Sequence, residues 1–203
     1  MRIKICGLTR DEDIDIVNEA RPDYIGFVFA KSKRQVSVAL AQYLRFRLAD
    51  SIIPVGVFVN NPINEIAALF HNGTISIAQL HGDEDESYIT QLKKKCLINE
   101  NTLQLKVIKT IKPDNFKLKN SAGADYYLFD SGAGSGKSFD WSTLKLKKID
   151  KPWFLAGGIN INNIEQAVKL NPFAVDVSSG AEVKGIKNRK KILELVAAVR
   201  GTL

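Results

Sequence analysis

Residues 153–180 read WFLAGGININNIEQAVKLNPFAVDVSSG. The stretch opens on a short apolar run, turns at two glycines, continues with helical spacing over 160–170 and closes on a second apolar run. Apolar runs of this length, bounded by Gly, Pro or Asn, are typical of strands, and the longer mixed segment is typical of a helix. A strand, a helix and another strand in this order predict a right-handed unit with parallel strands.

The same unit repeats along the whole chain. We predict strands at residues 3–6, 24–29, 54–59, 75–80, 103–108, 126–130, 153–156 and 174–177. We predict helices at 11–20, 37–48, 61–70, 85–95, 160–170 and 188–199, with weaker helical spacing at 112–121 and 141–144. Eight repeats favour an α/β fold, a single (β/α)₈ TIM barrel spanning residues 1–203, near the lower size limit of about 200 residues. An open doubly wound sheet is the alternative, but the first strand is followed by Cys6-Gly7-Leu8-Thr9-Arg10 and not by a dinucleotide fingerprint.

Composition places the chain among ordinary globular proteins. It is 45% hydrophobic and 25% charged, so a sizeable core is expected. The longest stretch without strongly polar residues, 52–59, is far short of the roughly 20 residues that span a bilayer. The first residues become polar within ten positions and lack the apolar core and small-residue cleavage site of a secretory signal, so we expect a cytoplasmic protein without a membrane partner.

The basic balance of the chain has several interpretations. The formal net charge is +7, but many lysines lie in runs at 93–95, 145–151 and 184–191, which are typical of solvated helix faces. A positive field would also steer a small anionic substrate to its site. We expect no nucleic-acid partner; a salt-dependent DNA shift would favour one. Cys6 and Cys96 have neither metal-type nor redox-type spacing, so we expect no metal site and no disulfide framework.

Two candidate catalytic residues stand at strand ends, where the active site of a barrel lies. Cys6 ends the first predicted strand, and a thiol there can act as a base once its pKa is lowered. Asp130 ends the sixth and precedes a loop with three glycines at 132–136, of a kind that closes over a ligand. The alternatives are that Cys6 is a small buried hydrophobe and Asp130 a turn residue.

Candidate phosphate-binding turns follow the last two strands. They are Gly157 and Gly158 after the seventh, and Ser178, Ser179 and Gly180 after the eighth. Loops at these places in a barrel frequently hold phosphate through backbone N–H groups, because glycine lets a ligand come close.

Three further polar residues are candidates near the same strand ends. Arg34, beyond the second strand, can clamp a carboxylate through two hydrogen bonds. His81, after the fourth, could line the pocket as a neutral imidazole or make a structural hydrogen bond. Asp176 is a secondary candidate, because its direction on the pleat is open.

Three motifs occur in order along the chain: Lys4-Ile5-Cys6-Gly7, Gln79-Leu80-His81-Gly82 and Ser178-Ser179-Gly180-Ala181-Glu182. With them the chain resembles the phosphoribosylanthranilate isomerases of tryptophan biosynthesis over essentially its whole length. The departures from the family pattern are Ala133 in the sixth loop, Ala181 and Asn188. Asn188 stands where Asp is usual and can still cap the last helix.

The resemblance implies an Amadori rearrangement of N-(5-phosphoribosyl)anthranilate to 1-(2-carboxyphenylamino)-1-deoxyribulose 5-phosphate, without cofactor or metal. In it, protonated Asp130 would open the sugar ring, Cys6 thiolate would remove the C2 proton, and Arg34 would bind the anthranilate carboxylate. The alternatives are the related histidine-pathway isomerisation, which uses two aspartates, and a non-catalytic binder of a phosphorylated ligand. Whether the chain is a monomer or a homodimer stays open.

Overall fold

The computed structural model describes residues 1–97, 104–111, 123–130 and 149–201. Within these ranges parallel strands pair in sequence order into a closed barrel: β1 (Arg2–Cys6), β2 (Tyr24–Val28), β3 (Ile53–Phe58), β4 (Ile77–Leu80), β5 (Lys106–Ile111), β6 (Tyr126–Asp130), β7 (Trp153–Ala156) and β8 (Ala174–Val177). The ring closes because β1 pairs with both β2 and β8. The predicted TIM barrel is confirmed.

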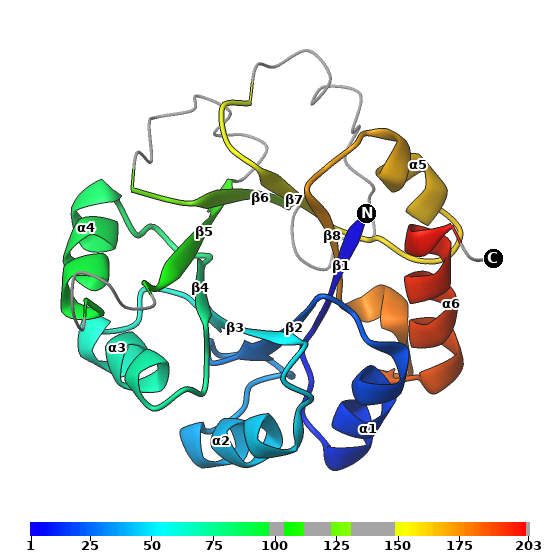
Figure 1. Cartoon of the computed structure of the whole chain (residues 1–203), viewed down its shortest axis with the longest axis horizontal. Helices are drawn as coiled ribbons and strands as arrows, with labels where there is room; N and C mark the ends of the chain where they lie inside the picture. Colours follow the sequence, from blue (N-terminus) through cyan, green and yellow to red (C-terminus); the bar gives the residue numbers. More distant parts are fainter. Residues whose placement is uncertain (98–103, 112–122, 131–148, 202–203) are drawn as a thin grey trace.

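Helices surround the strands (Figure 1). They are α1 (Asp11–Ala20), α2 (Val38–Arg47), α3 (Ile63–His71), α4 (Glu86–Lys95), α5 (Ile164–Lys169) and α6 (Arg189–Arg200). After β8 come a 3₁₀ turn, η3 (Ser179–Ala181), and a hairpin of β9 (Glu182–Val183) and β10 (Ile186–Lys187). The weaker helical segments at 112–121 and 141–144 lie outside the described residues, and the prediction of one domain over 1–203 stays a prediction.

Local side chains set where several helices begin. The Asn188 side chain accepts a hydrogen bond from the backbone N–H of Lys191, so the predicted cap of α6 is confirmed. Helix α5 is shorter than predicted. Residues 160–163 form a turn instead, because the Asn163 side chain accepts from the backbone N–H of Asn160 and thereby supplies this segment with a local alternative to the helix.

Strand β5 is displaced along the chain from its predicted position. Pairing with its neighbours places Lys109 beside Leu80 of β4 and Ile111 beside Phe129 of β6. The strand therefore runs to Ile111 and brings Lys109 and Thr110 to the carboxyl end of the sheet, where the sequence analysis placed a loop.

Apolar side chains fill the barrel, and its carboxyl end is polar. Val55, Ile77, Ile108, Leu128 and Phe154 belong to one buried cluster, and a second, larger cluster lies between the strands and the helices. Side chains on one face of a strand recur every second residue. Two residues beyond Ile77, Ile108 and Leu128, the inward-facing residues are the polar Gln79, Thr110 and Asp130. The candidate site lies at this end of the barrel.

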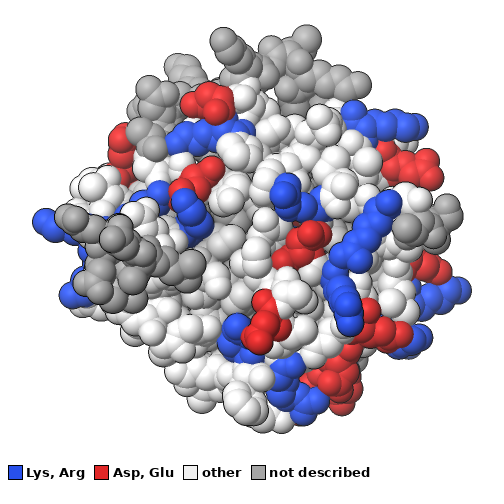
Figure 2. Space-filling view, in the orientation of Figure 1, with Lys and Arg blue, Asp and Glu red and all other residues white. Residues whose placement is uncertain are grey.

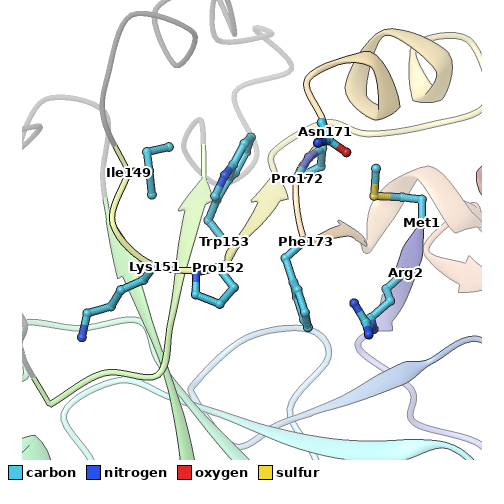
Figure 3. Close-up of a pocket in the computed structure, with 9 residues that line it drawn as sticks. All are labelled: Met1, Arg2, Ile149, Lys151, Pro152, Trp153, Asn171, Pro172 and Phe173. Atoms are coloured by element: carbon cyan, nitrogen blue, oxygen red, sulfur yellow. The ribbon is translucent and has the colours of Figure 1, made fainter.

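A cavity of about 760 Å³ lies at the amino ends of β1, β7 and β8 (Figure 3). Its lining includes Arg2, Lys151, Trp153 and Phe173, and the Arg2 guanidinium carbon is 4.4 Å from the centre of the Phe173 ring. The Lys151 amine donates to the carbonyl of Ala124, away from the other lining residues in Figure 3. The cavity is at the opposite end of the strands from every predicted site residue.

Basic and acidic side chains alternate over the face of the molecule seen in Figure 2. The positive net charge is thus not gathered into a single patch on that face. None of the helices in the described residues combines the length and the apolar composition that a membrane span requires.

Candidate active site

Cys6 ends β1 and is held in a slot between two strands. Its side chain is almost fully buried, at 8% exposed. In the parallel register Cys6 lies beside Gly26 of β2, and a Cβ on Gly26 would come within 2.6 Å of the Cys6 sulfur. Since real contacts of this kind are never so short, glycine at position 26 leaves the space that the thiol occupies.

An ion pair lies directly beneath the thiol. Lys4 is 0% exposed, and its Nζ donates to both carboxylate oxygens of Asp176 at 3.0 Å; it stands two residues before Cys6 on β1 and therefore on the same face of the strand. Burial acts to lower the pKa of Lys4, but Asp176 and Cys6 together raise it above its ordinary value. Burial and Asp176 raise the pKa of the Cys6 thiol, and Lys4 is the main opposing influence. Asp176 therefore points inward, which settles its direction on the pleat.

Lys4 is a functional candidate that the sequence analysis missed. It stands between Ile3 and Ile5 in a strand that is buried throughout from Ile3 to Cys6. A charged residue in such a strand requires a buried partner, and that requirement is the signal that would have found it.

Asp130 and His81 meet at the ends of β6 and β4. The His81 Nε2 atom lies 3.5 Å from Asp130 Oδ2. Its Nδ1 atom lies 3.2 Å from Thr110 Oγ1 and 3.4 Å from Gln79 Nε2. The imidazole thus lies between the Asp130 carboxyl group on one side and the Thr110 and Gln79 side chains on the other. Its tautomer decides which ring nitrogen donates a hydrogen bond. Thr110 and Gln79 were not predicted as site residues.

Arg34, which is partly exposed, forms a network with the buried Glu182 and Lys187. Its Nε and Nη2 atoms donate to the two carboxylate oxygens of Glu182 at 2.6 and 2.7 Å. Lys187 donates to Glu182 Oε1 at 2.6 Å and to the carbonyl of Ser178 at 3.1 Å. Burial alone would raise the pKa of Glu182, but the hydrogen bonds from Arg34 and Lys187 lower it to about 2. In this structure the guanidinium group of Arg34 thus binds a carboxylate of its own chain. Its binding of a ligand carboxylate stays a prediction.

The two glycine-containing turns adjoin each other. Gly157 and Gly158 adopt positive φ angles of 91° and 68°, and Gly158 has open space where a side chain would project. A Cβ on Gly180 would lie 1.9 Å from the carbonyl oxygen of Ile159, so the turn after β8 packs directly on the turn after β7. Ser178 Oγ donates to the Cys6 carbonyl at 3.2 Å and ties this turn to β1. Ser179 is exposed.

The predicted residues fall into two groups at one end of the barrel. Cys6, Arg34 and the turns at 157–158 and 178–180 form the first group, together with Lys4, Asp176, Glu182 and Lys187; His81 and Asp130 form the second. The glycine loop that follows Asp130, with Ala133, lies outside the described residues. Within the described ranges no three His, Cys, Asp or Glu side chains gather as metal ligands.

Comparison with known families identifies this arrangement. A family model for N-(5'-phosphoribosyl)anthranilate (PRA) isomerase matches residues 3–198. The chain belongs to this family. It is 46% identical to the N-(5'-phosphoribosyl)anthranilate isomerase of Endomicrobium trichonymphae, with 98% of each chain covered.

Two solved isomerases of the family share the barrel. One, in complex with reduced 1-(o-carboxyphenylamino)-1-deoxyribulose 5-phosphate, is 31% identical at a TM-score of 0.84, with 99% of each chain covered. The other is a structure of monomers generated from the dimeric isomerase of Thermotoga maritima, 31% identical at a TM-score of 0.82, again with 99% coverage of each chain.

Proposed function

We propose that this chain catalyses the reaction for which its family is named, the isomerisation of N-(5'-phosphoribosyl)anthranilate in tryptophan biosynthesis, with Asp130 as the acid and Cys6 as the base. The main support for this proposal is that Cys6 lies at the same end of the barrel as Asp130 and the paired glycine turns. Members of the family act on a substrate with a phosphate at one end and a carboxylate at the other, which suits a site with separate anion-binding features.

Asp130 starts the reaction at the sugar ring. Its carboxyl O–H bond breaks as the ring oxygen takes the proton, and the C1–O bond breaks as the anilino nitrogen forms a C1=N bond. His81 Nε2, 3.5 Å from the carboxyl group, is a partner for returning the proton, since an imidazole nitrogen can accept or donate one. Such a positioned acid typically contributes about 10²–10⁴-fold to the rate.

Cys6 completes the rearrangement. As a thiolate it takes the proton from C2; the electron pair of the C2–H bond forms C1=C2, and the C1=N pair returns to nitrogen. The resulting enol amine gives the ketone product when C1 gains a proton and the C2 hydroxyl loses one. Gly26 supports this role, since the space beside it keeps the sulfur at the end of β1.

Binding groups flank the reacting carbons. The backbone N–H groups of Gly157, Gly158 and the 178–180 turn bind the phosphate, supported by the positive φ angles and the open space at Gly158. Arg34 binds the anthranilate carboxylate with the N–H groups that Glu182 does not use. Holding both ends positions C1 and C2 between the acid and the base.

A turnover assay tests the proposed function. Purified protein should convert N-(5'-phosphoribosyl)anthranilate, and its gene should rescue a tryptophan auxotroph lacking this isomerase. Activity only on the aminoimidazole ribotide of histidine biosynthesis would favour the related isomerisation; binding of phosphorylated ligands without turnover would favour the non-catalytic binder. Cys6 in place of a second aspartate speaks against the former.

We also propose that the protein is cytoplasmic and is a monomer or a homodimer. Cys6 and Cys96 are both free thiols, which suits a reducing compartment. One solved relative is described as a dimeric isomerase from which monomers were generated. The mass in solution across a dilution series distinguishes them.

A further inference from the structure

Lys4 has no exposed surface, and its charge lies inside the barrel. An ammonium group has three N–H donors. Two of them serve the two oxygens of Asp176 at 3.0 Å, and Cys6 stands two residues further along β1, on the same face of the strand as Lys4. Taking a charged lysine wholly out of water is costly, and its partner Asp176, 172 residues away in sequence, is nearly as buried.

We propose that Lys4 is the counter-cation of the Cys6 thiolate, and that Asp176, the other partner of this cation, opposes the thiolate. Lys4 is then a positioning residue, since it acts on the substrate only through Cys6. The inference rests on the proposed function of Cys6 as the base, but the ionisation of the thiol can be measured without any turnover.

Other charges face the sulfur more weakly. Lys187 favours the thiolate, yet it donates a hydrogen bond to Glu182, which also accepts from the guanidinium group of Arg34. Asp176 opposes the thiolate. Among these charges Lys4 lowers the pKa of the Cys6 thiol most, and it lies on the same face of β1 as Cys6. In a buried site, where water does not screen the charges, this cation limits the rise of the Cys6 pKa that burial causes.

Substitutions of Lys4 and of Asp176 should shift the pKa of the Cys6 thiol in opposite directions. Lys4→Met removes the cation and should raise the Cys6 pKa by roughly 1–3 units, slowing alkylation by iodoacetamide about tenfold for each unit. Asp176→Asn removes the opposing anion and should lower the Cys6 pKa and speed alkylation. An ion pair with a merely structural role gives no such opposition, because losing either partner would only destabilise the fold.

The measurement is a pH titration of thiolate absorbance, paired with alkylation rates, in a Cys96→Ala background so that Cys6 is the sole thiol. Because Lys4→Met leaves Asp176 buried without its partner, the neutral double variant Lys4→Met/Asp176→Asn guards against misfolding. Its Cys6 pKa should still lie above that of the parent, since Lys4 influences the sulfur more than Asp176 does.

Lys109 supplies the matched control. It is a second buried lysine, paired with Glu84 at 3.0 Å, on β5 at the opposite side of the closed barrel from β1. Lys109→Met should lower stability and leave the Cys6 pKa unchanged. In the assay, Lys4→Met should lower kcat with little change in KM, and should shift the alkaline rise of the kcat profile to higher pH.

An unchanged Cys6 pKa in both Lys4→Met and the double variant would overturn the proposal, as would a shift in the same direction for Lys4→Met and Asp176→Asn. Full turnover by Cys6→Ala would instead overturn the assignment of Cys6 as the base, while the coupling between Lys4 and the thiol could still be read from the titration.

Discussion

Arg34 donates two short hydrogen bonds to the carboxylate of Glu182, from Nε at 2.6 Å and from Nη2 at 2.7 Å. The two residues are 148 positions apart and join the loop after β2 to the hairpin after β8. A guanidinium group has five N–H donors, so three remain for a ligand. Glu182 thus fixes the direction in which Arg34 can present them.

Arg34 is predicted to bind the carboxylate of the substrate. Arg34→Lys should lose affinity although it keeps the charge, because an ammonium lacks the planar fork, and Arg34→Ala should lose more. The loss should be of the order of 1.5–3 kcal/mol, the worth of a hydrogen bond to a charged group. The check is kcat/KM on an analogue without the carboxylate, where wild type and Arg34→Ala should be nearly equal. A large difference on that analogue would place the role of Arg34 elsewhere.

Glu182 should make stability depend on pH in the acid range. Its folded pKa of about 2 lies below the usual glutamate value of about 4.3, so its stabilisation is present above the unfolded pKa and disappears as pH falls toward 2. Glu182→Gln should be less stable than wild type at pH 7, with the gap closing between about pH 4.5 and 2. Urea unfolding at several pH values measures this; a gap that stays constant would contradict it.

Cys6→Ala should lower turnover by at least about 10²-fold with little change in substrate affinity, because it removes the base and no binding group. Cys96, buried at the end of α4, provides the control: Cys96→Ala should retain turnover. Near-normal kcat in Cys6→Ala would show that another group removes the proton.

Asp130→Asn should be at least as damaging as Cys6→Ala, because an amide has no acidic proton for the ring oxygen. Asp125, just before the opposite end of the same strand, is the matched control. It binds Lys93 and Lys106, so Asp125→Asn should lower stability and spare kcat. Equal kcat losses in the two variants would indicate a structural role for Asp130.

Gly158→Val should raise KM strongly, because its side chain would project into the open space assigned to the phosphate. Gly73 has a similar φ of 76° and equally open surroundings, but it precedes β4 at the other end of the barrel. Gly73→Val therefore reproduces the backbone strain alone and should leave KM unchanged. Inorganic phosphate should compete with substrate for wild type; absence of competition at tens of millimolar would argue for another phosphate site.

The sequence alone determined the barrel and most of the strand ends. Short apolar runs buried on both faces alternate with helical segments, and this pattern depends only on local spacing. It placed Cys6, Asp130 and the two glycine turns at strand ends because each directly follows or closes an apolar run. The cap at Asn188 was likewise local, a side chain bonded to a backbone group three residues on.

The pairing of the polar residues depends on the way the strands pack in the closed barrel. Lys4 meets Asp176 because β1 and β8 close the ring in a register that sets these residues side by side. Arg34 meets Glu182, and Thr110 reaches His81, through packing of segments far apart in the chain. The register between strands is fixed by closure of the whole barrel, so the local sequence around a residue does not predict which charged side chain it will face. A charged residue in a buried strand indicates that a partner is needed, and the fold determines which residue that partner is.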